Sequence, residues 1–197
     1  MTSRRLSVAI AAVLVAAGCA AAPPKPQTAP AHLRHPLAAA TASLAPASGT
    51  LVSGRLALTS DGDGVRIAGD IGGLGPGSTH GIHVHERGDC SAADASSAGG
   101  HFNPAGAAHG RAGSAAHHLG DIDNIVADAS GVAHVSMRID GAILGTGGDN
   151  DILGRAIVVH ANPDDYATQP SGNSGPRVAC GVIQMGMVQT GMVQTGG

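Results

Sequence analysis

The sequence predicts an all-β protein, a Greek-key antiparallel β-sandwich or flattened barrel with two long functional loops. Of its 197 residues 31 are Gly, whereas it has one Phe, one Tyr and no Trp, so small aliphatic side chains must fill the core. Short runs of alternating apolar residues recur along the chain and are separated by turn signals. No stretch keeps a helical period for three turns. Short strands joined by turns and loops therefore make up the fold.

Six short segments are predicted to be strands: residues 51–58, 65–71, 80–86, 131–139, 155–161 and 177–183. An Asp-Gly-Asp-Gly turn separates the first two and is a strong hairpin signal. The connections at 87–130 and 161–176 are longer than plain turns, and loops of that length in a compact domain are usually functional or disordered. We expect a single domain over residues 49–185.

Residues 1–19 have the pattern of a lipoprotein-type signal peptide. Arg4 and Arg5 precede an apolar run of about signal-peptide length, which ends at Ala-Ala-Gly-Cys. This ending resembles the bacterial lipoprotein cleavage box, in which the cysteine, here Cys19, becomes the lipidated N-terminus; cleavage without lipidation is the alternative. Both routes predict an exported protein of the periplasm or cell envelope, and the lipidated form would contact the membrane only through its anchor.

Residues 20–48 and 186–197 are predicted to lie outside the domain. The first segment is rich in Ala and Pro and has no alternating pattern, so we interpret it as a tether. The second carries the pentapeptide GMVQT twice in tandem, which is too few copies for a solenoid, and we expect a tail there.

The charge balance argues against a nucleic-acid partner. The formal net charge is −3, and the chain has no basic stripe that could neutralise phosphates. The 11 histidines equal Lys plus Arg in number, which is an unusual ratio. The histidines are therefore the residues most in need of an explanation.

The histidines form a pattern that indicates metal binding. His83 and His85 alternate on a predicted strand, so both imidazoles project from the same side of it. Such a pair is a weak signal by itself, and His160 at the end of an apolar strand could be a neutral core imidazole. The loop after residue 86 adds three imidazoles and a carboxylate that suit tetrahedral zinc: His101, His109, His118 and Asp121. A shared metal centre explains all of them together; His117, adjacent to His118, is the alternative third zinc histidine.

Five segments in this order closely resemble the copper/zinc superoxide dismutases: HGIHVHERGDC, GGHFNPAGAAHG, HHLGDIDNI, GRAIVVHANPDD and GNSGPRVACGVI. The resemblance runs from about residue 51 to 184. It implies copper bound by four histidines, which are His83, His85, His101 and His160. It also implies zinc bound by the bridging His101 and by three further residues, which are His109, His118 and Asp121.

The resemblance also implies roles for residues around the metals. Asp164 would tie the copper ligand His83 to the zinc ligand His109, and such outer bonds fix the tautomer and orientation of imidazoles. His80 would brace the backbone without binding metal. Arg177 would dock an anion beside copper, because a guanidinium attracts it by charge and by hydrogen bonds.

The implied activity is dismutation of superoxide to dioxygen and hydrogen peroxide, which would protect the cell envelope from oxidative stress. Redox-cycling copper would carry it out, with His101 as both ligand and proton donor and Arg177 as the second catalytic residue. Cys90 and Cys180 would form a disulfide between the long metal loop and the last strand. The segment 165–176 lacks the Glu and Lys that many relatives use to steer superoxide; steering charge raises the on-rate and does not create the reaction, so we expect activity and leave its salt dependence open.

One alternative function shares the fold. A non-catalytic envelope module that sequesters or delivers copper would need none of Arg177, a complete zinc set and the bridging His101, yet this sequence keeps all three. A third class is a surface interaction lipoprotein with a vestigial site. The expected small-molecule partner is the superoxide anion. A homodimer is compatible with the sequence, but no surface is assigned to it.

Overall fold

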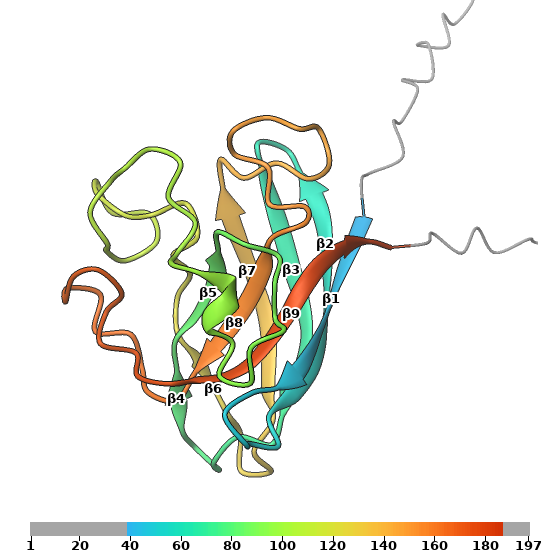
Figure 1. Cartoon of the computed structure of the whole chain (residues 1–197), viewed down its shortest axis with the longest axis vertical. Helices are drawn as coiled ribbons and strands as arrows, with labels where there is room; N and C mark the ends of the chain where they lie inside the picture. Colours follow the sequence, from blue (N-terminus) through green and yellow to red (C-terminus); the bar gives the residue numbers. More distant parts are fainter. Residues whose placement is uncertain (1–38, 187–197) are drawn as a thin grey trace, which may run out of the picture. The chain divides into compact units, whose positions relative to one another are not determined.

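The structure, a computed structural model, describes residues 39–186 and confirms the all-β prediction (Figure 1). Seven strands form one antiparallel sheet in the order β5-β8-β9-β1-β2-β3-β7. Their bounds are Ala39–Pro46 for β1, Ser53–Asp61 for β2, Gly64–Gly72 for β3, Ile82–His85 for β5, Ala133–Asp140 for β7, Ala156–His160 for β8 and Arg177–Met185 for β9. A second, two-stranded pair joins β4 (Thr79–His80) to β6 (Ile125–Val126), and the 3-10 turn η1 covers Ser96–Ala98.

The chain crosses repeatedly between the two ends of the sheet order, from β3 to β5, from β5 to β7 and from β7 to β8, as a Greek-key connection requires. Within residues 39–186 no helix is long and apolar enough to cross a membrane. The predicted signal peptide with Cys19, and the GMVQT repeats after residue 186, lie outside the described residues.

All six predicted strands are present, and the segment 80–86 is divided between β4 and β5. The β2–β3 hairpin closes at the Asp61–Gly64 pair. Gly62 in this turn has a φ of 61°, a left-handed conformation that glycine adopts without steric cost. The Asp-Gly signal in the sequence therefore marks the turn that it predicts.

The predicted tether, residues 20–48, is wrong at its C-terminal end because residues 39–46 form β1. This strand pairs with β2 on one side and with β9 on the other, so it lies inside the sheet. Its inward-facing residues Ala40, Ala42 and Leu44 are all buried. Two of these three are alanines, so the alternation carries little hydrophobic signal, and the neighbouring strands supply the hydrogen bonds that keep the segment extended.

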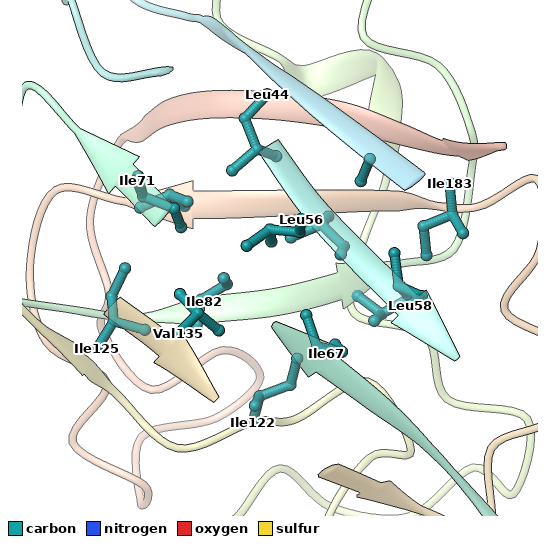
Figure 2. Packing of buried hydrophobic residues seen from close by; sticks show 14 of the residues in the cluster. Leu44, Leu56, Leu58, Ile67, Ile71, Ile82, Ile122, Ile125, Val135 and Ile183 are labelled. Carbon is teal, nitrogen blue, oxygen red and sulfur yellow. The ribbon is translucent and has the colours of Figure 1, made fainter. Parts of the chain in front are cut away.

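The core is built from small aliphatic side chains that project from both flanks of the curled sheet, as the composition predicts (Figure 2). Leu56 and Leu58 alternate inward along β2, and Ile67 and Ile71 do so along β3. Phe102, in the long loop after β5, is the single aromatic residue of this cluster. The loop that carries part of the metal site is thus anchored in the core.

A smaller apolar cluster lies on the other face of β8, where the loop around η1 covers the sheet. All five residues of β8 are buried, and Ala156 and Val158 pack with Ala95 and Ala98 of that loop. The Cys90–Cys180 disulfide joins the same loop to β9. The pairing that the resemblance implies is therefore confirmed, and the loop is held close to the start of β9 at Arg177.

Candidate metal centre

Two groups of side chains in the described part of the chain are close enough to hold a metal ion. We call the first the four-histidine set, which consists of His83, His85, His101 and His160. The second, the mixed set, consists of His101, His109, His118 and Asp121. Within each set the candidate ligand atoms lie within 4.8 Å of one another, and every member is buried. His101 belongs to both sets.

Main-chain hydrogen bonds bring together three segments that are distant in sequence. Val84 on β5 accepts from the N–H of Phe102 at 2.8 Å, Phe102 accepts from Gly120 at 2.9 Å, and Gly120 accepts from Val84 at 2.9 Å. These hydrogen bonds also pair the neighbouring residues: His83 lies opposite Asp121, and His85 lies opposite His101. A Cβ atom at position 120 would lie 2.2 Å from the Val84 carbonyl oxygen, so this approach requires glycine.

Hydrogen bonds assign the ring protons of the four-histidine set. A carbonyl or carboxylate oxygen only accepts, so the ring nitrogen facing it carries the proton. His83 donates from Nε2 to Asp164 Oδ2 at 2.8 Å, His85 from Nδ1 to the Gly99 carbonyl at 2.9 Å, and His160 from Nδ1 to the Gly175 carbonyl at 3.2 Å. The other nitrogen of each ring then carries a lone pair.

Burial keeps these three rings neutral. It is the largest effect on each pKa, and it lowers the pKa of His83 to about 4, that of His160 to about 3 and that of His85 well below its ordinary value. A neutral imidazole has one proton, so the lone pairs assigned above persist at pH 7. Neutral imidazoles are the form in which histidine binds metals.

The orphaned nitrogens test whether these residues fit metal ions. Among residues 39–186, four buried ring nitrogens have no hydrogen-bond partner: His83 Nδ1, His101 Nε2, His109 Nδ1 and His118 Nδ1. A buried polar atom without a partner costs about 1–3 kcal/mol, whereas a cation accepts such lone pairs as ligands. Four imidazoles suit copper, and three imidazoles with one carboxylate suit a closed tetrahedral zinc site. The residues present therefore fit both ions.

The mixed set is organised around the Asp121 carboxylate. Its Oδ1 lies 2.8 Å from Nδ1 of His101, and its Oδ2 accepts from the main-chain N–H of His118 at 2.8 Å. Burial raises the pKa of Asp121, but these hydrogen bonds and that from Gly110 outweigh it and hold the pKa well below its usual range. Asp121 is therefore ionised, and the set offers a negative charge to a cation.

The neighbouring histidine does not join the mixed set. His117 Nδ1 donates to the main-chain carbonyl of His118 at 2.8 Å, and His117 is not a member of the group. His118, favoured by the sequence pattern, is the member of the adjacent pair that the structure places there.

Asp164 connects the two sets. Its Oδ2 accepts from His83 and its Oδ1 accepts from Nε2 of His109 at 2.9 Å. Burial raises the pKa of Asp164, but hydrogen bonds from His83, from the main-chain N–H of Tyr166 and from His109 lower it to about 2. The two partner rings are thereby fixed in the tautomers that leave their Nδ1 atoms free.

Arg177, at the start of β9, is half-buried and held by the loop around η1. It donates to the Ala95 carbonyl and to the Gly99 carbonyl, both at 2.5 Å. The Gly99 oxygen also accepts from His85, so one carbonyl connects the guanidinium to the four-histidine set. Arg177 lines an open depression together with His85, His101 and His160. A small anion that enters there meets the arginine and the four-histidine set together.

Three further features of the sequence lie outside the sets and make structural contacts instead. His80 Nδ1 donates to the main-chain carbonyl of His160 at 2.8 Å, so it braces the backbone at the end of β8. His134 lies on the exposed side of β7, 2.7 Å from Asp70. The segment 165–176 forms part of the depression wall through Pro170 and Ser171, which bring no charge to it.

Sequence reasoning missed two residues that support the site. Asn124 Nδ2 donates to the Asp164 carbonyl at 2.9 Å, and Asn124 Oδ1 accepts from the Asp164 N–H at 2.8 Å. Gln169 makes the same pair of contacts with the main chain of His109, at 2.9 and 2.8 Å. Both are side-chain amides that contact only the backbone of their partner, and no spacing rule in the sequence reveals such a contact.

The comparisons with known proteins agree with this geometry. Residues 52–183 match the family model of copper/zinc superoxide dismutase. Superoxide dismutase (Cu-Zn) 2 of Aquifex aeolicus (strain VF5) is 40% identical over 136 residues, 68% of this chain and 80% of that protein. The superoxide dismutase-like protein YojM of Bacillus subtilis (strain 168) is 40% identical over 127 residues, 63% of this chain and 65% of that protein.

A solved structure agrees as well. The crystal structure of a SOD-like protein from Bacillus subtilis superposes with a TM-score of 0.66 at 38% identity, and the match covers 72% of this chain and 95% of that one. An all-β fold in which β5, β8 and the loop after β5 place a four-histidine set and a mixed set around a shared imidazole is typical of a class of proteins with two metal sites. The chain belongs to the copper/zinc superoxide dismutase family.

Proposed function

We propose that this domain dismutates superoxide, with copper in the four-histidine set and zinc in the mixed set. One observation carries the proposal: the two ligand sets share His101, and Arg177 lines the same depression as members of the four-histidine set. When bound, copper would supply one-electron redox cycling and zinc a redox-inert positive charge. A copper store needs neither the shared imidazole nor an arginine facing the copper ligands.

Arg177 would bind the substrate. Its guanidinium is fixed by two main-chain carbonyls and keeps its charge at any physiological pH. Superoxide is an anion, so a fixed cation beside the four-histidine set raises its local concentration and orients it by charge-assisted hydrogen bonds.

His101 would hold a proton for the product. Two superoxide anions and two protons give one dioxygen and one hydrogen peroxide, so the site must pass one electron from one anion to the other and supply two protons. His101 Nε2 is buried, has no hydrogen-bond partner and faces the four-histidine set, while Nδ1 is engaged with Asp121. Nε2 is therefore the atom to which we assign the proton that passes to the reduced oxygen species.

We further propose that the protein acts in the periplasm or cell envelope, anchored through Cys19, where it would protect against superoxide. The Cys90–Cys180 disulfide supports an oxidising compartment. Mass spectrometry of the protein from producing cells tests the anchor: cleavage before Cys19 with a diacylglyceryl group on that residue is expected, and globomycin, which blocks the lipoprotein signal peptidase, should leave residues 1–18 attached. The molar mass of the purified protein, measured by light scattering, tests whether it forms a homodimer.

The deciding experiment compares metal-reconstituted wild type with H160A and R177A. H160A removes one member of the four-histidine set alone, so copper binding and dismutation should both fall, with zinc retained. R177A should keep both metals and lose roughly ten- to a hundred-fold in rate, the size of a lost charge-assisted hydrogen bond. H134A is the matched control, because that histidine lies outside both sets. Wild type that is fully loaded but inactive would instead indicate the copper-sequestering module.

A further inference from the structure

We propose that Asn124 and Gln169 form a reciprocal amide clamp that positions the zinc half of the metal centre, Asn124 by fixing Asp164 and Gln169 by fixing His109. This inference deepens the proposed function and rests on it, since it takes the mixed set to be the zinc site. The two amides are positioning residues, because neither belongs to a ligand set.

The clamp connects two loops in both directions. Asn124 belongs to the loop that carries the mixed set and pairs with both main-chain groups of Asp164. Gln169 belongs to the loop that carries Asp164 and pairs with both main-chain groups of His109. Each amide thus satisfies one N–H and one carbonyl of the opposite loop, as a neighbouring strand would do.

The two clamped residues also contact each other directly. His109 Nε2 donates to Asp164 Oδ1 at 2.9 Å, and that bond leaves His109 Nδ1 free to face the mixed set. A ring can rotate about its side-chain torsions unless its backbone and its far nitrogen are both fixed. Gln169 fixes the backbone of His109, Asp164 fixes its far nitrogen, and Asn124 in turn fixes Asp164.

Tyr166 strengthens the Asn124 side of the clamp. Its hydroxyl oxygen accepts from the Asn124 N–H at 2.9 Å, so the two loops share a third link beside the first two. Nearby, Gly172 passes so close to Asp164 that a Cβ there would lie 1.7 Å from Oδ1. Gly172 therefore limits the movement of the Asp164 carboxylate, and Asn124 fixes the main chain of Asp164.

The geometry predicts different metal effects for the two amides. Gln169 contacts only His109 among the members of the two sets, so its loss should weaken zinc binding alone. Asn124 acts through Asp164, which contacts His83 as well as His109, so its loss should weaken the hold on both metals. A general loss of stability would not separate the two metals in this way.

The test measures metal release from the copper- and zinc-loaded full chain into a chromogenic chelator. Q169M keeps the length of the side chain and removes both hydrogen bonds, and we expect zinc release to accelerate roughly ten-fold with copper release unchanged. Q169E keeps the acceptor for the His109 N–H and loses the donor, so its zinc release should be intermediate. N124L should accelerate the release of both metals.

T168V is the matched control. Thr168 lies in the same loop and its hydroxyl donates to Asp165, but it contacts neither set, so its zinc release should equal that of wild type. Melting of the metal-free variants shows whether each still folds. Zinc release from Q169M at the wild-type rate, or equal acceleration of zinc and copper in Q169M, would overturn the clamp while leaving the proposed function intact. A wild-type protein that takes up no zinc would overturn the proposed function and the clamp with it.

Discussion

Asp164 Oδ2 lies 2.8 Å from Nε2 of His83, a histidine on a strand eighty-one positions earlier in the chain, and both side chains are fully buried. The second carboxylate oxygen accepts from His109, so one acidic residue sets the proton position on one ring of each set. Asp164 can fix the tautomers of His83 and His109 only while both of its carboxylate oxygens accept a hydrogen bond from these rings.

The substitution D164N should therefore weaken metal binding. An amide has one acceptor oxygen, and its NH2 group would face a ring nitrogen that already carries a proton. That ring can relieve the clash by moving its proton to Nδ1, the nitrogen that faces the metal. We expect the affinity for at least one metal to fall about ten- to a hundred-fold, measured by competition with a chelator.

The matched variant for that prediction is D165N. Asp165 is exposed and accepts only from Ala167 and Thr168 of its own loop, so its removal should leave both affinities unchanged. Equal metal affinities in D164N and wild type would show that Asp164 does not fix the tautomers.

The disulfide should stabilise the domain and hold Arg177 in place. Cys90 and Cys180 are 90 residues apart in sequence, and closing a loop of that size contributes about 4–5 kcal/mol in the chain-entropy model. The same loop carries the Ala95 and Gly99 carbonyls that hold Arg177. Paired C90S and C180S substitutions should lower the urea midpoint of unfolding and slow dismutation, with both metals retained at low temperature.

Reductant provides the control for the disulfide. It should lower the midpoint of wild type to that of the double variant and leave the double variant unchanged. A reduced wild type with an unaltered midpoint would mean that the smaller apolar cluster between β8 and the loop around η1 holds the loop in place without the disulfide.

Residue types at recognisable spacing were sufficient to predict six strand segments, whereas the two ligand sets that share His101 and the Cys90–Cys180 pairing followed from the resemblance to a known family. The strand β1 was not predicted because two of its three inward side chains are the methyl groups of alanine. Its extended conformation comes from pairing with β2 and β9. Alternation detects a strand only when the buried side chains are larger than the exposed ones.

The supporting contacts of the site escaped prediction for a different reason. Asn124 and Gln169 bind main-chain atoms of residues that are 40 and 60 positions away. Every residue type has these main-chain atoms, so the contact does not restrict which residue stands at the bound position. The glycine at position 120 is similar, since its requirement arises from the Val84 carbonyl on another segment. Such contacts become visible only once the loops are placed in space.

His134 should titrate above its ordinary range, in contrast to the buried histidines. Asp70 on β3 lies 2.7 Å from its Nδ1, and this hydrogen bond, with the charges of Asp70 and Asp128, raises the pKa of His134. A raised pKa means that the folded state binds the proton more tightly, so this contribution to stability is present below pH 6.5 and is lost as pH rises through the raised pKa.

The substitution D70N tests the assignment of His134. It should lower the pKa of His134 towards its ordinary value, as measured by the pH dependence of its ring NMR signals, and leave the metal content unchanged. An unchanged pKa in D70N would show that Asp70 does not govern this histidine. Because both side chains are largely exposed, the effect on overall stability should be small.

Glu86 should slow the approach of superoxide at low salt. It lines the same depression as Arg177, while the wall formed by segment 165–176 adds no cation, so an approaching anion meets one attractive and one repulsive side chain. E86Q should raise kcat/KM about two-fold at low ionic strength, and the gain should vanish near 1 M salt, where the screening length is about 3 Å. D149N, which removes an exposed carboxylate outside this depression, is the matched control for net charge. Equal gains in E86Q and D149N would assign the effect to the charge of the whole domain, and a gain that persists at high salt would assign it to a change in the shape of the depression.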